Sequence, residues 1–216
     1  MRGTTTLVTT ASVLAKGPLD RVRRGVGAAG RRAWVAPLAE GWVLVLPERP
    51  ASPAEDVDPY DLVGLGRSLQ DAGCPQVLVI SVRGALATAQ LISRGAPSAF
   101  VGWRGELHAR GPASRVEPDA TRFAVQMGVP ERGELLELLL EQVGPDPSER
   151  LRAFCLAFGL PTAAIGITAE DVAEERRHLP TVERYLRQGR LAQVRARLSV
   201  RRRRLVATLP RPRRGR

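Results

Sequence analysis

Apolar and polar positions follow two kinds of spacing over the first 105 residues of the chain. Apolar runs rich in β-branched residues predict five strands, at 4–15, 33–38, 42–46, 76–82 and 98–103. Apolar positions three and four residues apart predict helices at 18–30, 58–72 and 85–93. Strands interleaved with helices predict an α+β or α/β body in which helices cover a mixed sheet.

The pattern beyond residue 105 is helical. Leucines at three- and four-residue spacing predict a helix over 131–143. Ser148 is expected to cap the next helix and Thr168 a third one, because hydroxyl side chains satisfy free N–H groups at helix starts. Ile167 and Val172 flank the Thr168 cap at the spacing of a hydrophobic staple.

Charge is distributed very unevenly along this pattern. The 216 residues have a formal net charge of +11, and Lys16 is the only lysine. Residues 187–216 contain 12 arginines and no aspartate or glutamate, so this stretch holds +12 and residues 1–186 hold −1. Such a segment predicts binding to a polyanion, whereas the rest of the chain has no net charge that would attract one.

Length, spacing and charge together predict four parts. They are an α/β body at 1–145, a helical connector at 146–166, a basic helical or winged-helix segment at 167–206, and a disordered arginine-rich tail at 207–216. The hydrophobic share of 44% is sufficient for a packed core in the body.

The basic segment contains a series of motif residues between positions 167 and 205. In chain order they are Thr168, Glu170, Val172 and Ala173, then Thr181, Val182, Arg184 and Leu186, then Gly189, Leu191, Val194 and Arg195. With Arg201–Arg204 in place of the basic strand of a wing, this segment resembles the winged helix-turn-helix of excisionase and MerR-type DNA-binding proteins.

The resemblance implies a helix from Thr181 that presents Thr181, Arg184 and Arg187 to a major groove. It also implies phosphate contacts from the arginines that follow. These are Arg195, Arg197, Arg201, Arg202, Arg203 and Arg204.

The alternative is a plain basic helical hairpin. Its apolar stripe would consist of Leu191, Val194, Leu198 and Leu205, and it would lie on nucleic acid or on an anionic membrane surface. No aromatic residue that would anchor the segment in lipid follows Tyr185, which favours nucleic acid.

Catalytic chemistry is sparse in this sequence. The only histidines are His108 and His178, and no serine or cysteine nucleophile is indicated beside His108. Gly64 and Gly66 suggest a phosphate loop, but they lie inside a helical pattern, which favours close helix packing instead. No catalytic residue is assigned, and a non-enzymatic function is favoured.

A small-molecule site, if the body has one, is expected at the ends of the strands. Ser81 and Arg83 end the most apolar strand and Arg104 follows another, so these three residues form the candidate ligand site.

The two cysteines and the N-terminal residues indicate in which cellular compartment the protein is expected. Cys74 and Cys155 are expected to be small buried hydrophobes without a disulfide, and the chain spaces no zinc ligands suitably. Neither a metal nor a cofactor is expected. Threonines interrupt the apolar run at the N-terminus, so no signal peptide is expected, and no stretch reaches the length of a membrane span. The prediction is a cytoplasmic protein.

The functional hypothesis is a DNA-associated regulatory protein that binds nucleic acid through its basic segment. The body would sense a ligand, dimerise or dock a partner, so a homodimer is one of the possible assemblies. One alternative is an interaction module whose segment docks on an acidic protein or an anionic membrane surface. The other is a small α/β enzyme with its site near Ser81 and Arg83.

Overall fold

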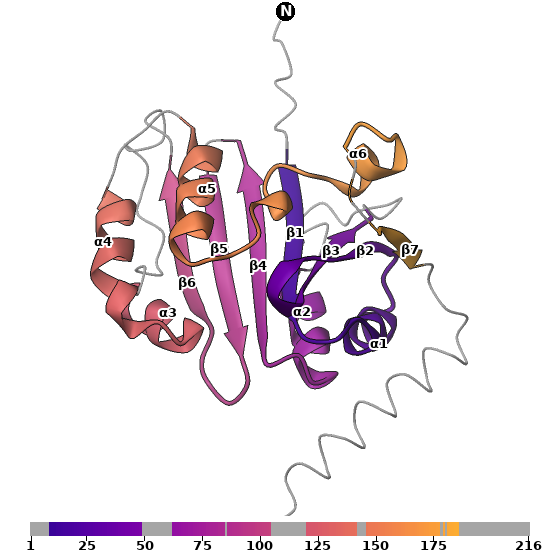
Figure 1. Cartoon of the computed structure of the whole chain (residues 1–216), viewed down its shortest axis with the longest axis horizontal. Helices are drawn as coiled ribbons and strands as arrows, with labels where there is room; N and C mark the ends of the chain where they lie inside the picture. The colour runs from indigo at the N-terminus through magenta and orange to yellow at the C-terminus, as the bar shows by residue number, and fades with distance from the viewer. Residues whose placement is uncertain are drawn as a thin grey trace, which may run out of the picture.

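A single antiparallel sheet organises the chain (Figure 1). The computed structural model describes residues 9–48, 62–84, 86–104, 120–141, 146–177, 179 and 181–185. Within these residues seven strands follow the order β6-β5-β4-β1-β3-β2-β7, and every neighbouring pair is antiparallel. The predicted α+β class is confirmed, and the sheet is antiparallel throughout rather than mixed.

The strands and helices have the following bounds. The strands are β1 (Thr9–Lys16), β2 (Ala33–Pro37), β3 (Trp42–Pro47), β4 (Gln76–Arg83), β5 (Leu86–Ser93), β6 (Ala99–Arg104) and β7 (Glu183–Tyr185). The helices are α1 (Leu19–Ala29), α2 (Leu62–Asp71), α3 (Ala120–Met127), α4 (Gly133–Glu141), α5 (Pro147–Ala157) and α6 (Ala169–Ala173). Short 3-10 turns lie at Ala39–Gly41, Pro130–Arg132 and Thr162–Ala164.

Helices cover both faces of the sheet, because successive side chains of a strand point to opposite sides. On one face Val13 and Ala15 of β1 belong to a core with residues of α1 and α2. On the other face Leu14 belongs to a core with residues of α3, α4, α5 and α6. The sheet therefore separates two helical layers (Figure 1).

Two glycines allow close packing in the layer that contains α1 and α2. A Cβ at Gly25 of α1 would lie 2.7 Å from the Cα atom of Leu69 in α2. A Cβ at Gly66 of α2 would lie 2.5 Å from Cδ1 of Ile92 in β5. Neither position accepts a Cβ unless its neighbour moves, and that neighbour is the backbone of Leu69 at Gly25 but the flexible end of the Ile92 side chain at Gly66. The expectation of close helix packing at Gly66 is thus confirmed.

The helix predicted at 85–93 is wrong, because Leu86–Ser93 forms strand β5. Alanines raise the local helix propensity, yet Ala87, Ala89 and Leu91 are buried at every second position, which is the period of a strand. Arg83 pairs with Leu86 across a tight turn in which Gly84 has a φ of 56°. Pairing with β4 and β6 therefore outweighs the propensity of the segment.

Described residues between 146 and 179 pack in the same core as the strands. Phe154 of α5 contacts the rings of Trp103, Phe123 and Phe158 at centroid distances of 5.3, 5.4 and 5.0 Å. Val172 of α6 is buried in the same cluster. Described residues on both sides of positions 145 and 166 therefore share one core, and the division into four parts stays a prediction.

The helix caps and boundaries of the α3–α6 layer also differ from the sequence prediction. Asp146, not Ser148, caps α5, since its side chain accepts a hydrogen bond from the N–H of Ser148 at 2.8 Å. Helix α3 was not predicted. The helix expected over 131–143 is present as α4, and one of its leucines, Leu135, is 41% exposed. No helix within the described ranges is long and apolar enough to cross a membrane.

Candidate nucleic-acid interface

Strand β7 joins the end of the described chain to the edge of the sheet. Tyr185 pairs with Ala33, Arg184 with Trp34 and Glu183 with Val35 of β2. The arginine-rich segment follows β7 directly in the sequence. The position of β7 therefore fixes where that segment leaves the body.

Side chains on both faces of the sheet hold β7 in place. On one face Arg184 lies over the ring of Trp34 at 5.5 Å, and its Nε atom donates a hydrogen bond to Glu48 Oε1 at 2.7 Å. That hydrogen bond raises the pKa of Arg184. On the other face Glu183 forms an ion pair with Arg23 of α1. Tyr185 packs there against the core of the α1–α2 layer, and this burial raises its pKa.

The helix expected to begin at Thr181 is wrong over the residues that the structure describes. Glu183–Tyr185 is a strand, and Thr181 has a φ of 55°, which lies outside the right-handed helical region. The sheet edge offers backbone partners that outweigh the helical pattern. Arg184 is consequently engaged with Glu48 and Trp34 instead of lying on a free helix face. The other predicted contacts, Arg187, Arg195, Arg197, Arg201, Arg202, Arg203 and Arg204, lie outside the described residues.

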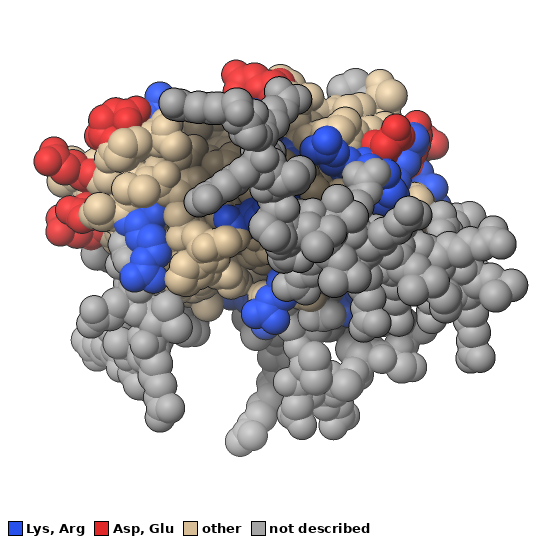
Figure 2. Space-filling view, turned by 90° about the horizontal axis from the view of Figure 1, so that it is seen from below, with Lys and Arg blue, Asp and Glu red and all other residues tan. Residues whose placement is uncertain are grey.

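The two helical layers have opposite charge. Residues 17–32 and 62–73, which contain α1 and α2, hold six arginines and two acidic residues, a formal charge of +4. The described residues of the α3–α6 layer, 120–141 and 146–177, hold ten acidic residues and six arginines, a formal charge of −4. In Figure 2 acidic side chains gather along the upper and left rim, whereas most basic side chains lie closer to the middle of the view.

Tyr185, the last described residue before the arginine-rich segment, lies beside the basic α1–α2 layer. Tyr185 lies opposite Ala33, and the two residues before Ala33 are Arg31 and Arg32, at the junction of α1 and β2. Arg32 is exposed. The last described residue before the segment therefore lies beside the basic α1 side of the body.

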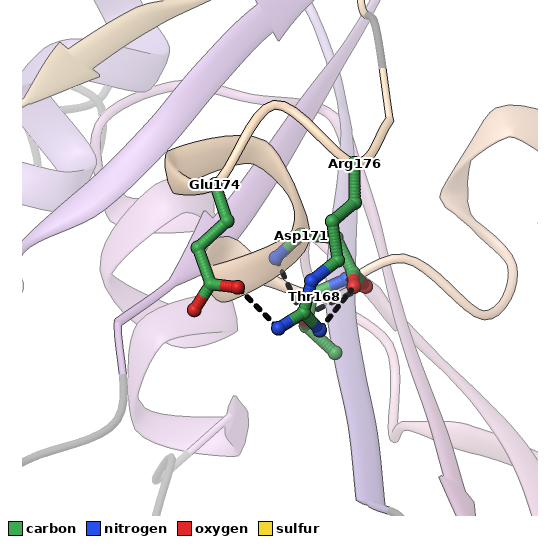
Figure 3. Close-up of polar contacts among 4 residues, drawn as sticks. All are labelled: Thr168, Asp171, Glu174 and Arg176. Atoms are coloured by element: carbon green, nitrogen blue, oxygen red, sulfur yellow. Dashed lines mark hydrogen bonds and ion pairs between the residues drawn. The ribbon is translucent and has the colours of Figure 1, made fainter.

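In the acidic α3–α6 layer, carboxylates neutralise the charge of Arg176. Thr168 caps α6 as predicted and forms a capping box with Asp171, whose side chain accepts from the Thr168 N–H at 2.9 Å. Arg176 then forms ion pairs with Asp171, at 3.7 Å, and with Glu174 (Figure 3). An arginine held between two carboxylates offers little attraction to an external anion.

The candidate ligand residues occupy neighbouring backbone positions at one end of strands β4, β5 and β6. Arg83 pairs with Leu86 and Leu86 with Arg104, so the two arginines occupy the same cross-strand row. Ser81 lies two residues earlier on the same face and its Oγ atom is 2.8 Å from Oγ1 of Thr88. The structure thus places the three predicted residues near one another, with Ser81 already hydrogen-bonded.

The remaining candidates give no reactive centre among the described residues. Cys74 and Cys155 are buried and unpaired, and burial raises their pKa values to about 11 and about 12. His108 and His178 lie outside the described residues. In the part of the chain that the structure describes, no three His, Cys, Asp or Glu side chains are grouped to hold a metal.

In comparisons with known proteins, no family model, no curated protein and no solved structure matches this chain.

Proposed function

We propose that this protein binds nucleic acid through its arginine-rich C-terminal segment, with the basic α1 side of the body next to the bound strand. The observation that carries the proposal is the run of 12 arginines without an acidic residue from 187 to 216. Unrelieved like charge of this size requires counter-ions, and the phosphates of nucleic acid supply them at high density.

The placement of β7 supports the orientation of this contact. Tyr185, two residues before the segment, pairs with Ala33 next to Arg31 and Arg32, whereas the carboxylates of the α3–α6 layer lie across the sheet. A polyanion is attracted to the first side and repelled by the second. The basic segment therefore acts together with one side of the body, and a regulatory role on DNA fits this arrangement.

A truncation after Tyr185 tests the proposal. It removes the arginine-rich segment but keeps every described element, including β7. Binding of duplex DNA to full-length and truncated protein is measured across about 50–200 mM salt, where six to ten phosphate contacts give a loss of about 10³–10⁵ in affinity. Loss of binding on truncation, with a steep salt dependence in the full chain, is the expected result.

Anionic vesicles provide the competing partner in the same experiment. The proposal expects DNA binding to persist in their presence. Tighter binding to vesicles than to DNA would instead assign the segment to a membrane surface, and absence of both would leave an acidic protein as its partner.

A further inference from the structure

Helix α4 exposes leucines next to carboxylates on one of its sides. Leu135 and Leu138 are 41% and 58% exposed, although both are large apolar residues. Glu134 lies four positions before Leu138 and Glu141 lies three positions after it, so these side chains share one side of the helix. Within the described ranges of the chain neither glutamate forms an ion pair. These four residues are called the outer face of α4.

The opposite side of α4 is the one that the core of the body uses. Leu136 and Leu139 are buried in the core of this layer. The carbonyl oxygen of Leu139 also accepts a hydrogen bond from Nε1 of Trp103 in β6 at 3.1 Å. Helix α4 is therefore held against the sheet without its outer face, whose leucines remain in solvent. Apolar side chains exposed together and rimmed by polar groups are typical of protein interaction surfaces.

The arginine-rich segment has the complementary pattern in its sequence. Leu191, Val194 and Leu198 follow one another at spacings of three and four residues, which is typical of one side of a helix. Arg195 and Arg202 are placed four residues after Leu191 and Leu198, so they would lie on the same side. An apolar stripe with cations beside it matches leucines with carboxylates beside them, both in polarity and in charge.

The position of β7 prevents the segment from reaching α4 of its own molecule. Strands β7 and β6 lie at opposite ends of the sheet, and α4 lies beside β6 (Figure 1). Six strand spacings of about 4.8 Å separate the two strands by about 29 Å. Leu191 follows Tyr185, the last residue of β7, by six positions, which span at most about 22 Å. The stripe that begins at Leu191 must therefore come from another molecule.

We propose that the outer face of α4 binds residues 191–205 of a second copy of this chain. The apolar stripe of the segment packs on Leu135 and Leu138, and its arginines form ion pairs with Glu134 and Glu141. Each molecule provides both halves of the contact, so two copies can pair reciprocally around a two-fold axis. The contact depends on carboxylates of the body, so it does not rest on the proposed binding of nucleic acid.

Sedimentation equilibrium of the full chain, freed of nucleic acid by washing in high salt, tests this contact. We expect concentration-dependent association at about 100 mM salt. Leu135→Ala combined with Leu138→Ala should weaken it at least about tenfold, because apolar area is no longer buried between the copies. Glu134→Gln combined with Glu141→Gln should weaken it and make it less sensitive to salt. All four side chains are exposed, so circular dichroism should show native folding of both variants.

The matched control is Glu170→Gln combined with Glu175→Gln, which removes two exposed carboxylates from the same acidic layer but away from α4. It should leave the association unchanged, and equal effects of the two glutamate pairs would overturn the proposal. A full chain that remains monomeric up to about 1 mM overturns it as well. Truncation after Tyr185 should give a monomer, and association that survives this truncation would show that the copies meet through another surface.

Discussion

The Nε atom of Arg184 donates a hydrogen bond to Oε1 of Glu48 at 2.7 Å, joining residues 136 positions apart in the chain. The same guanidinium lies over Trp34, which is paired with Arg184 across the sheet. One side chain therefore links three strands, β7, β2 and the end of β3. This relationship holds β7, which precedes the arginine-rich segment in the sequence, against β2.

Replacing Arg184 with Gln is expected to loosen β7. The substitution removes the contact with Glu48 and the stacking on Trp34, so the edge of β2 opens more often. Amide hydrogen exchange in β2 should become faster, while exchange in β4 stays unchanged. Arg177→Gln, an exposed arginine outside β7, is the control. Identical exchange in both variants would show that Arg184 does not hold the strand.

Gly25→Ala is expected to destabilise the protein by about 1–3 kcal/mol. The new Cβ would approach the backbone of Leu69 to 2.7 Å, and a backbone atom cannot move aside as a flexible side chain can. Urea unfolding measures the change. Gly133→Ala is the matched control, because its Cβ would meet nothing closer than 3.7 Å at a helical φ. It should be neutral or stabilising by about 0.4–1 kcal/mol.

Stability should fall above pH 9 because of the buried cysteines. Burial raises the pKa of Cys74 from 9.0 to about 11 and that of Cys155 to about 12. The unfolded thiols ionise first, so their contribution is intact below pH 9 and is lost as the pH rises to about 11–12. Each thiol adds a slope of up to about 1.4 kcal/mol per pH unit.

Urea midpoints between pH 7 and 11 measure this loss. Cys74→Ala should have a flatter dependence than the unmodified chain over the same range. An unchanged slope would contradict the assignment to Cys74. In the native protein neither thiol should react with a thiol reagent at pH 8, since the thiolate is the reactive form.

Thr168→Ala is expected to cost about 1 kcal/mol, because it removes the side-chain cap of α6. Asp146→Ala should have a similar cost at α5. Ser148→Ala should be near neutral, because only its backbone N–H takes part in that cap. Urea unfolding of the three variants compares them directly, and a larger loss from Ser148 than from Asp146 would contradict the assigned cap.

Substituting Arg201, Arg202, Arg203 and Arg204 together by Gln should weaken binding to all duplexes alike. If each contacts one phosphate, the slope of log affinity against log salt falls by about 3.6. Arg152→Gln on the acidic layer should leave the slope unchanged. A sequence-dependent loss from the four substitutions would mean that these arginines read bases rather than phosphates.

Much of the fold follows from the sequence pattern. The strands around 33–46 and 76–82 were predicted because their apolar runs are long and β-branched. Strand β5 was missed because its alanines favour a helix, and only pairing with β4 and β6 reveals the period of two. Strand β7 was missed because a three-residue strand has no periodicity, and its partner is about 150 positions away.

Less of the candidate nucleic-acid interface could be predicted from the sequence. The charge of the segment is visible in the sequence, but its attachment beside Arg31 and Arg32 depends on the register of β7 with β2.

The pairing of Ala33 with Tyr185 has a consequence for synthesis on the ribosome. At about 5–20 residues per second, β2 is made roughly 8–30 s before β7. Throughout that interval the nascent chain presents an unpaired edge, on which another nascent chain can pair. Strand β7 covers this edge of β2 only after almost the whole body has been made, so completion of the body and synthesis of the cationic segment are consecutive events.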